Sequence, residues 1–137
     1  MARFFTILPA LAATVLPGFP SGSGANLRWF KNQTYNFEIL RSLGESTYGG
    51  AEVGEVLSAI SDVREGDDEA WYRGWRRVAA MVEDRASTLE NPVSRGKAML
   101  RASNYYRTAE FFLHPADKRR LPTFEKSVEN FYGGLDS

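Results

Sequence analysis

The chain of 137 residues contains no cysteine and only one histidine, His114. The lack of cysteine excludes disulfide scaffolds, thiolate zinc sites and cysteine nucleophiles. The chain also lacks an excess of either charge, because 17 basic residues balance 17 acidic ones. No overall field therefore attracts a nucleic acid or an anionic membrane surface, and we expect neither as a partner.

The common catalytic motifs are missing as well. The segment nearest to the GxSxG elbow of serine hydrolases is GESTY at residues 44–48, where tyrosine replaces the second glycine and a helix comes before it instead of a strand. His114 stands beside a proline at a predicted helix end, where it is expected to cap free carbonyls. There is no HExxH, GxxxxGK[ST] or GxGxxG motif. We therefore predict no catalytic, cofactor-binding or metal-binding residue.

The first 25 residues differ from the rest of the chain. An apolar run at residues 4–16 follows Arg3, and PGFPSGSGA follows the run. The segment is either a secretory signal peptide, with Ser23 and Ala25 at the positions that a signal peptidase reads, or a loosely packed arm. The run is too short to span a membrane. With a signal peptide the protein would be secreted and Asn32 could be glycosylated; otherwise we expect a cytoplasmic protein.

Residues 26–137 have the composition of one globular domain. Apolar residues recur with helical spacing in five segments, and none shows the alternation of a strand. We predict an all-α domain of about five helices in antiparallel hairpins. The expected helices cover residues 26–43, ended by Gly44; residues 53–66; residues 68–89; residues 93–113; and a last segment around residues 124–131, ended by Gly133 and Gly134.

The acidic trio Asp67, Asp68 and Glu69 begins the third predicted helix. A cap at Asp67 with two carboxylates in the first turn explains all three better than a metal site. Asn91 and Pro92 end this helix and begin the next.

The fourth segment, GKAMLRASNYYRTAEFFL at residues 96–113, organises the predicted fold. Its apolar face alternates small alanines with large aromatic residues, which lets another helix approach closely. The expected core consists of Trp71, Trp75, Val82, Ala102, Tyr105, Ala109 and Phe112.

One polar and aromatic run, NYYR at residues 104–107, has the composition of a ligand surface. Core packing with a partner for each hydroxyl is the alternative. The candidate surface facing a substrate or a catalytic core consists of Tyr48, Asn104, Tyr105, Tyr106, Arg107, Phe111 and Phe112.

The segments YGGAEVGEVL, GDDEAWY and RASNYYRTAEFF, within residues 28–131, resemble the N-terminal helical region of α/β-hydrolases of the dihydropseudooxynicotine hydrolase type. They are especially similar to fungal members from secondary-metabolite clusters, including polyketide-shortening and fusarin-pathway hydrolases. The resemblance implies a helical cap over an α/β-hydrolase core whose Ser/Asp/His triad comes later in the chain. No residue up to Ser137 matches a triad position, so the resemblance implies no activity for this chain alone.

The resemblance also implies the hydrolase core as a partner, and the surplus of aromatic residues predicts self-association. The alternative is a free-standing interaction module, because residues 68–113 have the size of a tetratricopeptide-like hairpin. That hairpin is not repeated elsewhere in the sequence.

Overall fold

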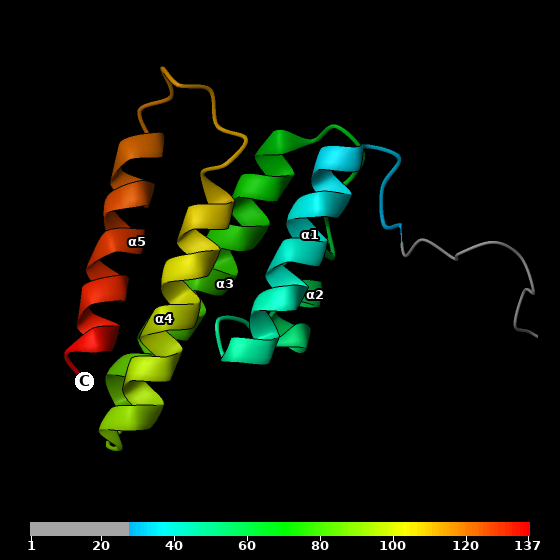
Figure 1. The fold of residues 1–137 in the computed structure, drawn as a ribbon. Helices are drawn as coiled ribbons and strands as arrows, with labels where there is room; N and C mark the ends of the chain where they lie inside the picture. The colour runs from blue at the N-terminus through cyan, green and yellow to red at the C-terminus, as the bar shows by residue number, and fades with distance from the viewer. Residues whose placement is uncertain (1–27) are drawn as a thin grey trace, which may run out of the picture.

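A computed structural model of the chain describes residues 28–137 (Figure 1). The expected arm or signal peptide at residues 1–25 lies outside the described residues. All regular elements within residues 28–137 are helices, which confirms the all-α prediction. They are α1 (Gln33–Glu45), a short 3₁₀ helix η1 (Ser46–Tyr48), α2 (Val53–Ile60), α3 (Asp68–Thr88), α4 (Pro92–Ala109) and α5 (Arg120–Leu135).

The first helix starts later than predicted. The Asn32 side chain accepts hydrogen bonds from the backbone N–H groups of Thr34 and Tyr35, so Asn32 is the N-cap and residues 28–32 precede the helix. The predicted end at Gly44 is also wrong, since α1 continues to Glu45 and into η1. The chain leaves η1 at Gly49, whose φ of 78° lies in the left-handed region that glycine tolerates. The second helix ends at Ile60, six residues before the expected limit.

The predicted caps of α3 and α4 are confirmed. The Asp67 carboxylate accepts a hydrogen bond of 2.8 Å from the Ala70 N–H, and the Asn91 side chain accepts one of 3.0 Å from the Ser94 N–H. Pro92 occupies the first turn of α4, where its missing N–H costs no helical hydrogen bond. Local sequence chemistry therefore determines where both long helices begin.

The ends of α4 and α5 differ from the prediction. α4 stops at Ala109 rather than Leu113, and His114 does not cap it: the His114 Nδ1 accepts a hydrogen bond from the Ala116 N–H in the following turn. α5 continues through Gly133 and Gly134 to Leu135. These glycines do not end the helix. Gly134 instead allows α5 to pack closely on α4, because a Cβ atom at this position would lie 2.9 Å from Leu100 Cγ.

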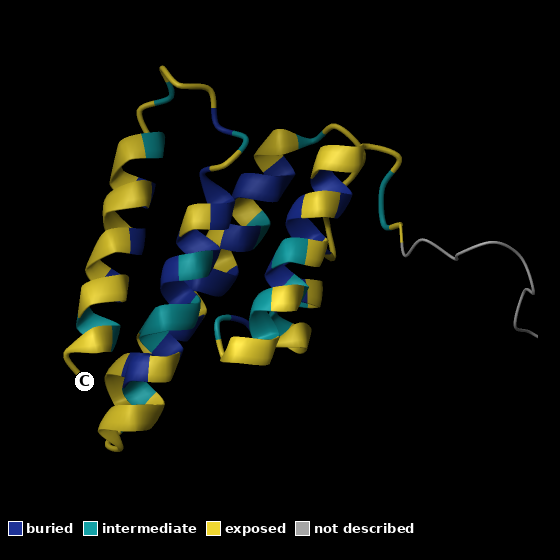
Figure 2. Cartoon of the chain, in the orientation of Figure 1, coloured by how far each residue is buried: buried dark blue, intermediate teal, exposed yellow. Residues whose placement is uncertain are grey.

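The core lies between α3 and α4, which run antiparallel with α5 against α4 and with α1 and α2 on the other side (Figures 1 and 2). Trp71 and Trp75 are fully buried, and the Trp71 indole N–H donates to the Thr108 carbonyl at 2.9 Å. Six of the seven predicted core residues are buried; Phe112 is partly buried and packs at the edge of the core. None of the described helices is long and apolar enough to cross a lipid bilayer.

Candidate functional site

The predicted site residues do not form a single surface. Tyr105 and Tyr106 are buried, and their hydroxyls reach different neighbouring helices. Tyr48 is 92% exposed in η1. Arg107 and Phe111 are exposed, whereas Asn104 and Phe112 are of intermediate exposure. The NYYR run therefore places two tyrosines inside the bundle and one arginine at its surface.

Tyr105 connects α4 to the start of α2. Its hydroxyl donates a hydrogen bond of 2.7 Å to the Glu55 carboxylate and accepts one of 2.8 Å from the Glu52 N–H. Arg101, one turn earlier on α4, pairs with the same carboxylate at 3.0 Å. Burial of the phenol, reinforced by the Glu55 carboxylate, holds the pKa of Tyr105 far above its usual value. The hydroxyl is therefore a structural donor and not an acid near neutral pH.

Tyr106 joins three helices through Glu83 of α3. The Glu83 carboxylate accepts hydrogen bonds from the Tyr106 hydroxyl at 2.7 Å and from the Asn130 amide of α5 at 3.0 Å, and it pairs with Lys126 at 3.2 Å. Burial raises the pKa of Glu83, but these three donors outweigh burial, so the pKa lies below its usual value. Glu83 is therefore an ionised anchor for α4 and α5.

Asn104 and Phe112 also have packing roles. The Asn104 amide donates a hydrogen bond of 2.8 Å to the Gly50 carbonyl and so holds the loop before α2. The Phe112 ring lies 4.6 Å from the Tyr35 ring and 5.0 Å from the Trp71 ring, centroid to centroid. Both contacts favour the structural alternative for these two positions.

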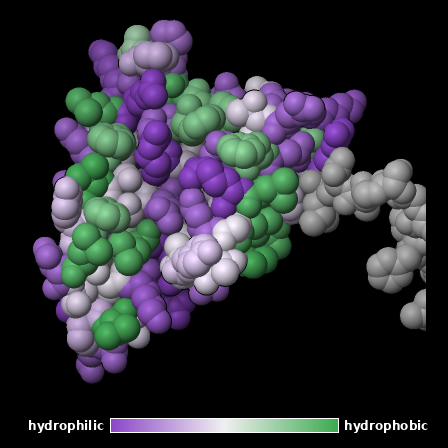
Figure 3. All heavy atoms as spheres, viewed as in Figure 1, coloured by the Kyte–Doolittle hydropathy of each residue, from purple (hydrophilic) through white to green (hydrophobic). Residues whose placement is uncertain are grey.

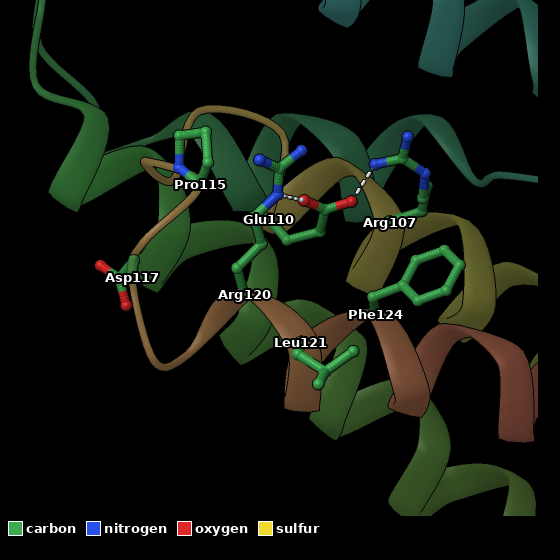
Figure 4. A pocket seen from close by; sticks show the side chains of 7 residues that line it. All are labelled: Arg107, Glu110, Pro115, Asp117, Arg120, Leu121 and Phe124. Atoms are coloured by element: carbon green, nitrogen blue, oxygen red, sulfur yellow. Dashed lines mark hydrogen bonds and ion pairs between the residues drawn. The ribbon is translucent and has the colours of Figure 1, made fainter.

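The surface between the end of α4 and the start of α5 holds a pocket of about 370 Å³ (Figure 4). The Glu110 side chain, only 3% exposed, lies between two arginines: one oxygen pairs with Arg107, and the other pairs with Arg120 at 3.0 Å. The Arg107 guanidinium lies 5.9 Å from the centre of the Phe124 ring. Pro115, Asp117 and Leu121 complete the lining.

The arrangement of this pocket suits an anionic or polar group that carries an apolar part. Glu110 fixes two guanidinium groups that remain partly exposed, while Phe124 and Leu121 offer apolar surface. Asp117 adds little negative charge to the cluster because it pairs with Arg119 at 2.7 Å, which also lowers the pKa of Asp117 to about 2. The prediction from the sequence included Arg107 but missed Glu110 and Arg120, which join it only through the turn between the helices.

α5 carries a second surface feature, in which polar residues pack inside and apolar residues face water. Its buried residues are Thr123, Ser127 and Asn130. The Tyr72 and Thr123 hydroxyls lie 3.3 Å apart, and those of Ser103 and Ser127 lie 3.4 Å apart. The exposed apolar residues form what we call the α5 stripe: Leu121, Phe124, Val128, Phe131 and Leu135.

Hydrophobic side chains also gather over α1 on the same face of the molecule, separated from those over α5 by polar ones (Figure 3). Phe37 and Leu40 of α1 and Phe111 after α4 are exposed. We call these three residues the α1 patch. No group of three or more acidic or histidine side chains within residues 28–137 is placed to hold a metal ion.

No family model matches the chain. The chain is 42% identical to the hydrolase acrC of Aspergillus aculeatus over an alignment of 114 positions, with 80% of this chain and 27% of that protein covered. It is 40% identical to the 20-hydroxy-prefusarin hydrolase of Gibberella moniliformis, with 77% of this chain and 26% of the relative covered. It is 38% identical to the α/β hydrolase psoB of Aspergillus fumigatus, with 77% and 25% covered.

The chain thus spans about a quarter of the length of the curated relatives it matches. All regular elements of the described residues are helices, as expected for the helical region of such a protein rather than its catalytic sheet. The resemblance predicted from the sequence is confirmed: the chain is similar, over about a quarter of their length, to fungal proteins named as hydrolases or α/β hydrolases.

Proposed function

We propose that residues 26–137 form the cap of a fungal α/β-hydrolase of secondary metabolism, which acts on a hydrophobic carbonyl compound such as a polyketide. The observation that carries the proposal is that a chain whose described regular elements are all helices matches about a quarter of several proteins named as hydrolases. In this proposal the Ser/Asp/His triad belongs to the remaining part of the hydrolase. We then expect no hydrolase activity from the chain by itself, since its sequence contains no nucleophile elbow to act with its one histidine.

The α1 patch and the pocket beside Arg107 are the surfaces we assign to this role. A cap must offer apolar area to the domain it covers and to a hydrophobic substrate, and Phe37, Leu40 and Phe111 leave such area in water. The two guanidinium groups held by Glu110, the residue before Phe111, add donors for a carbonyl or carboxylate oxygen. The catalytic domain of the hydrolase is therefore the proposed partner.

A chimeric enzyme tests the proposal. In the hydrolase acrC, the segment of 114 residues that matches this chain would be replaced by the corresponding residues of this chain. We expect the chimera to fold and to react with a serine-directed fluorophosphonate probe, while acrC lacking the segment reacts weakly or is insoluble. The isolated chain should not react with the probe.

A matched pair of substitutions makes the test specific to the proposed surface. Phe111→Glu in the chimera should reduce labelling by the probe, whereas Met81→Glu, at an exposed apolar position of α3 outside the proposed surface, should not. The proposal would be overturned by a soluble, folded chimera that the probe does not label. Labelling of the isolated native chain, lost on denaturation, would refute the claim that it has no activity alone.

A further inference from the structure

Two adjoining pockets on the surface of α3 are lined by basic side chains. Arg76 and Arg119 line both of them. Lys118 completes the basic lining of the first pocket, of about 290 Å³, and Arg73 and Arg77 complete that of the second, of about 440 Å³. No carboxylate of residues 28–137 lines either pocket. We call the two together the α3 pockets, and they share no lining residue with the pocket between α4 and α5.

Arg119 is a fixed part of the wall of both pockets. Its guanidinium pairs with Asp117 at 2.7 Å and with Glu69 at 2.9 Å, and it lies 4.6 Å from the centre of the Tyr72 ring. Glu69 also pairs with Arg73 at 3.6 Å. These two arginines and two carboxylates balance one another in charge. Of the five N–H donors of Arg119, three go to the carboxylates, which leaves two for a ligand.

The free positive charge of the α3 pockets comes from Arg76, Arg77 and Lys118. These side chains are exposed, and none of them pairs with a carboxylate among residues 28–137. Arg77 donates instead to the Ser58 carbonyl at 2.8 Å, so its charge stays uncompensated. Three such charges therefore lie around two small pockets, in a chain whose basic and acidic residues are equal in number.

The distribution of these charges fits a ligand with two linked anionic groups. Arg76 lines both pockets, Lys118 lines only the first and Arg77 only the second, so each pocket offers two free cations. Phosphate groups carry more than one negative charge near neutral pH, and guanidinium groups bind their oxygens in pairs. Pockets of a few hundred Å³ have the size of small-molecule sites.

We infer that the α3 pockets bind the diphosphate group of a small soluble molecule. The inference goes beyond the proposed function, because it concerns another surface than the α1 patch and the pocket beside Arg107.

Isothermal titration calorimetry on the native chain at low ionic strength tests the inference, with inorganic pyrophosphate as the probe. We expect one pyrophosphate to bind per chain, about tenfold more tightly than inorganic phosphate, because only pyrophosphate adds a second charge-assisted contact. No binding of pyrophosphate at millimolar concentration would overturn the inference. Equal affinities for pyrophosphate and phosphate would overturn the assignment of a diphosphate group.

A matched pair of substitutions locates the site. Arg76→Gln should weaken pyrophosphate binding about tenfold, the loss expected for one charge-assisted contact, and Lys118→Gln should weaken it as well. Arg85→Gln is the control, since it removes the same charge from an exposed position of α3 outside both pockets. All three variants should keep the helical circular dichroism spectrum. An equal loss of affinity in Arg76→Gln and Arg85→Gln would show a general charge effect and overturn the site.

Vesicles separate a soluble ligand from a membrane surface that carries phosphate groups. The native chain should not sediment with vesicles of phosphatidylcholine and phosphatidylserine under conditions in which it binds pyrophosphate. Sedimentation that Arg76→Gln abolishes and pyrophosphate does not reverse would overturn the assignment to a small molecule. Since only this chain is present, failure of the inference would leave the proposed hydrolase role to the chimera test.

Discussion

The Tyr105 hydroxyl donates a hydrogen bond of 2.7 Å to the Glu55 carboxylate and accepts one of 2.8 Å from the Glu52 backbone N–H. A single buried oxygen therefore satisfies two groups at the start of α2 and joins that helix to α4. The free energy of this link is open to direct measurement.

Tyr105→Phe removes this oxygen and leaves both partners short of a hydrogen bond. We expect the free energy of unfolding to fall by about 1–3 kcal/mol, the usual cost of an unpaired buried polar group. Urea unfolding followed by circular dichroism measures it. Tyr48→Phe, at a position 92% exposed, is the control and should change stability by less than about 0.5 kcal/mol. Equal effects of the two substitutions would contradict the structural role of Tyr105.

Alkaline pH should destabilise the fold through Tyr35, Tyr105 and Tyr106. Burial, reinforced by a neighbouring carboxylate in each case, raises the pKa of all three phenols above the ordinary value of about 10. The folded state therefore holds these protons more tightly than the unfolded state. The stabilisation is fully present below about pH 10 and is lost as the pH rises above it.

The measurement combines tyrosinate absorbance with circular dichroism in an alkaline titration. The three buried phenols should ionise together with the loss of helical signal. Ionisation of all the tyrosines before any loss of helix would contradict the predicted link between the pKa shifts and stability.

Gly74→Ala should destabilise the crossing of α2 and α3. A Cβ atom at Gly74 would lie 2.0 Å from the Ala59 carbonyl oxygen, so the backbones of the two helices must separate. We expect the free energy of unfolding to fall by about 3 kcal/mol, which is the upper part of the range for overpacking. Gly54→Ala is the matched control, because nothing lies within 4 Å of its added methyl group. Thermal unfolding should show a lower melting temperature only for the Gly74 variant.

Trp75→Ala should lower the free energy of unfolding by about 3–5 kcal/mol, because the side chain is fully buried in the core. Trp75→Phe should cost less, since it keeps much of the apolar volume and removes an indole N–H that has no hydrogen-bond partner among residues 28–137. Denaturant unfolding of both variants measures the difference. A phenylalanine variant no more stable than the alanine variant would show that the indole N–H is satisfied in solution.

The helices and most of the core could be predicted from periodicity and caps, but several helix boundaries and the inward face of α5 could not. Asn32 caps α1 through its own side chain, and this local chemistry overrides the aromatic run that suggested an earlier start. Gly133 and Gly134 suggested the end of a helix, yet Gly134 is required where α5 meets Gly96 and Leu100 of α4. The glycine at position 134 is thus explained by contact with α4, a helix distant in the sequence, and not by the end of α5.

The apolar spacing of α5 correctly predicted a helix, but periodicity alone does not say which face packs inward. The core already contains Trp71, Trp75 and Tyr105, and α4 meets α5 through small and polar residues such as Ser103. The inward face of α5 is therefore the one with Thr123 and Ser127. In the same way, the pocket beside Arg107 depends on a turn that brings Arg120 to Glu110. No sequence motif predicts this ion pair.

The helices pack largely in the order in which they are made, α2 on α3, α3 on α4 and α4 on α5. Each helical hairpin joins two segments that are neighbours in the sequence. Bringing them together therefore closes only a short loop, which costs little conformational entropy. Helical folds in which most contacts join helices that are neighbours in the sequence reach the native state within microseconds to milliseconds. Residues 28–137 should therefore complete their fold soon after α5 leaves the ribosome, before the exposed apolar face of α5 meets anything else.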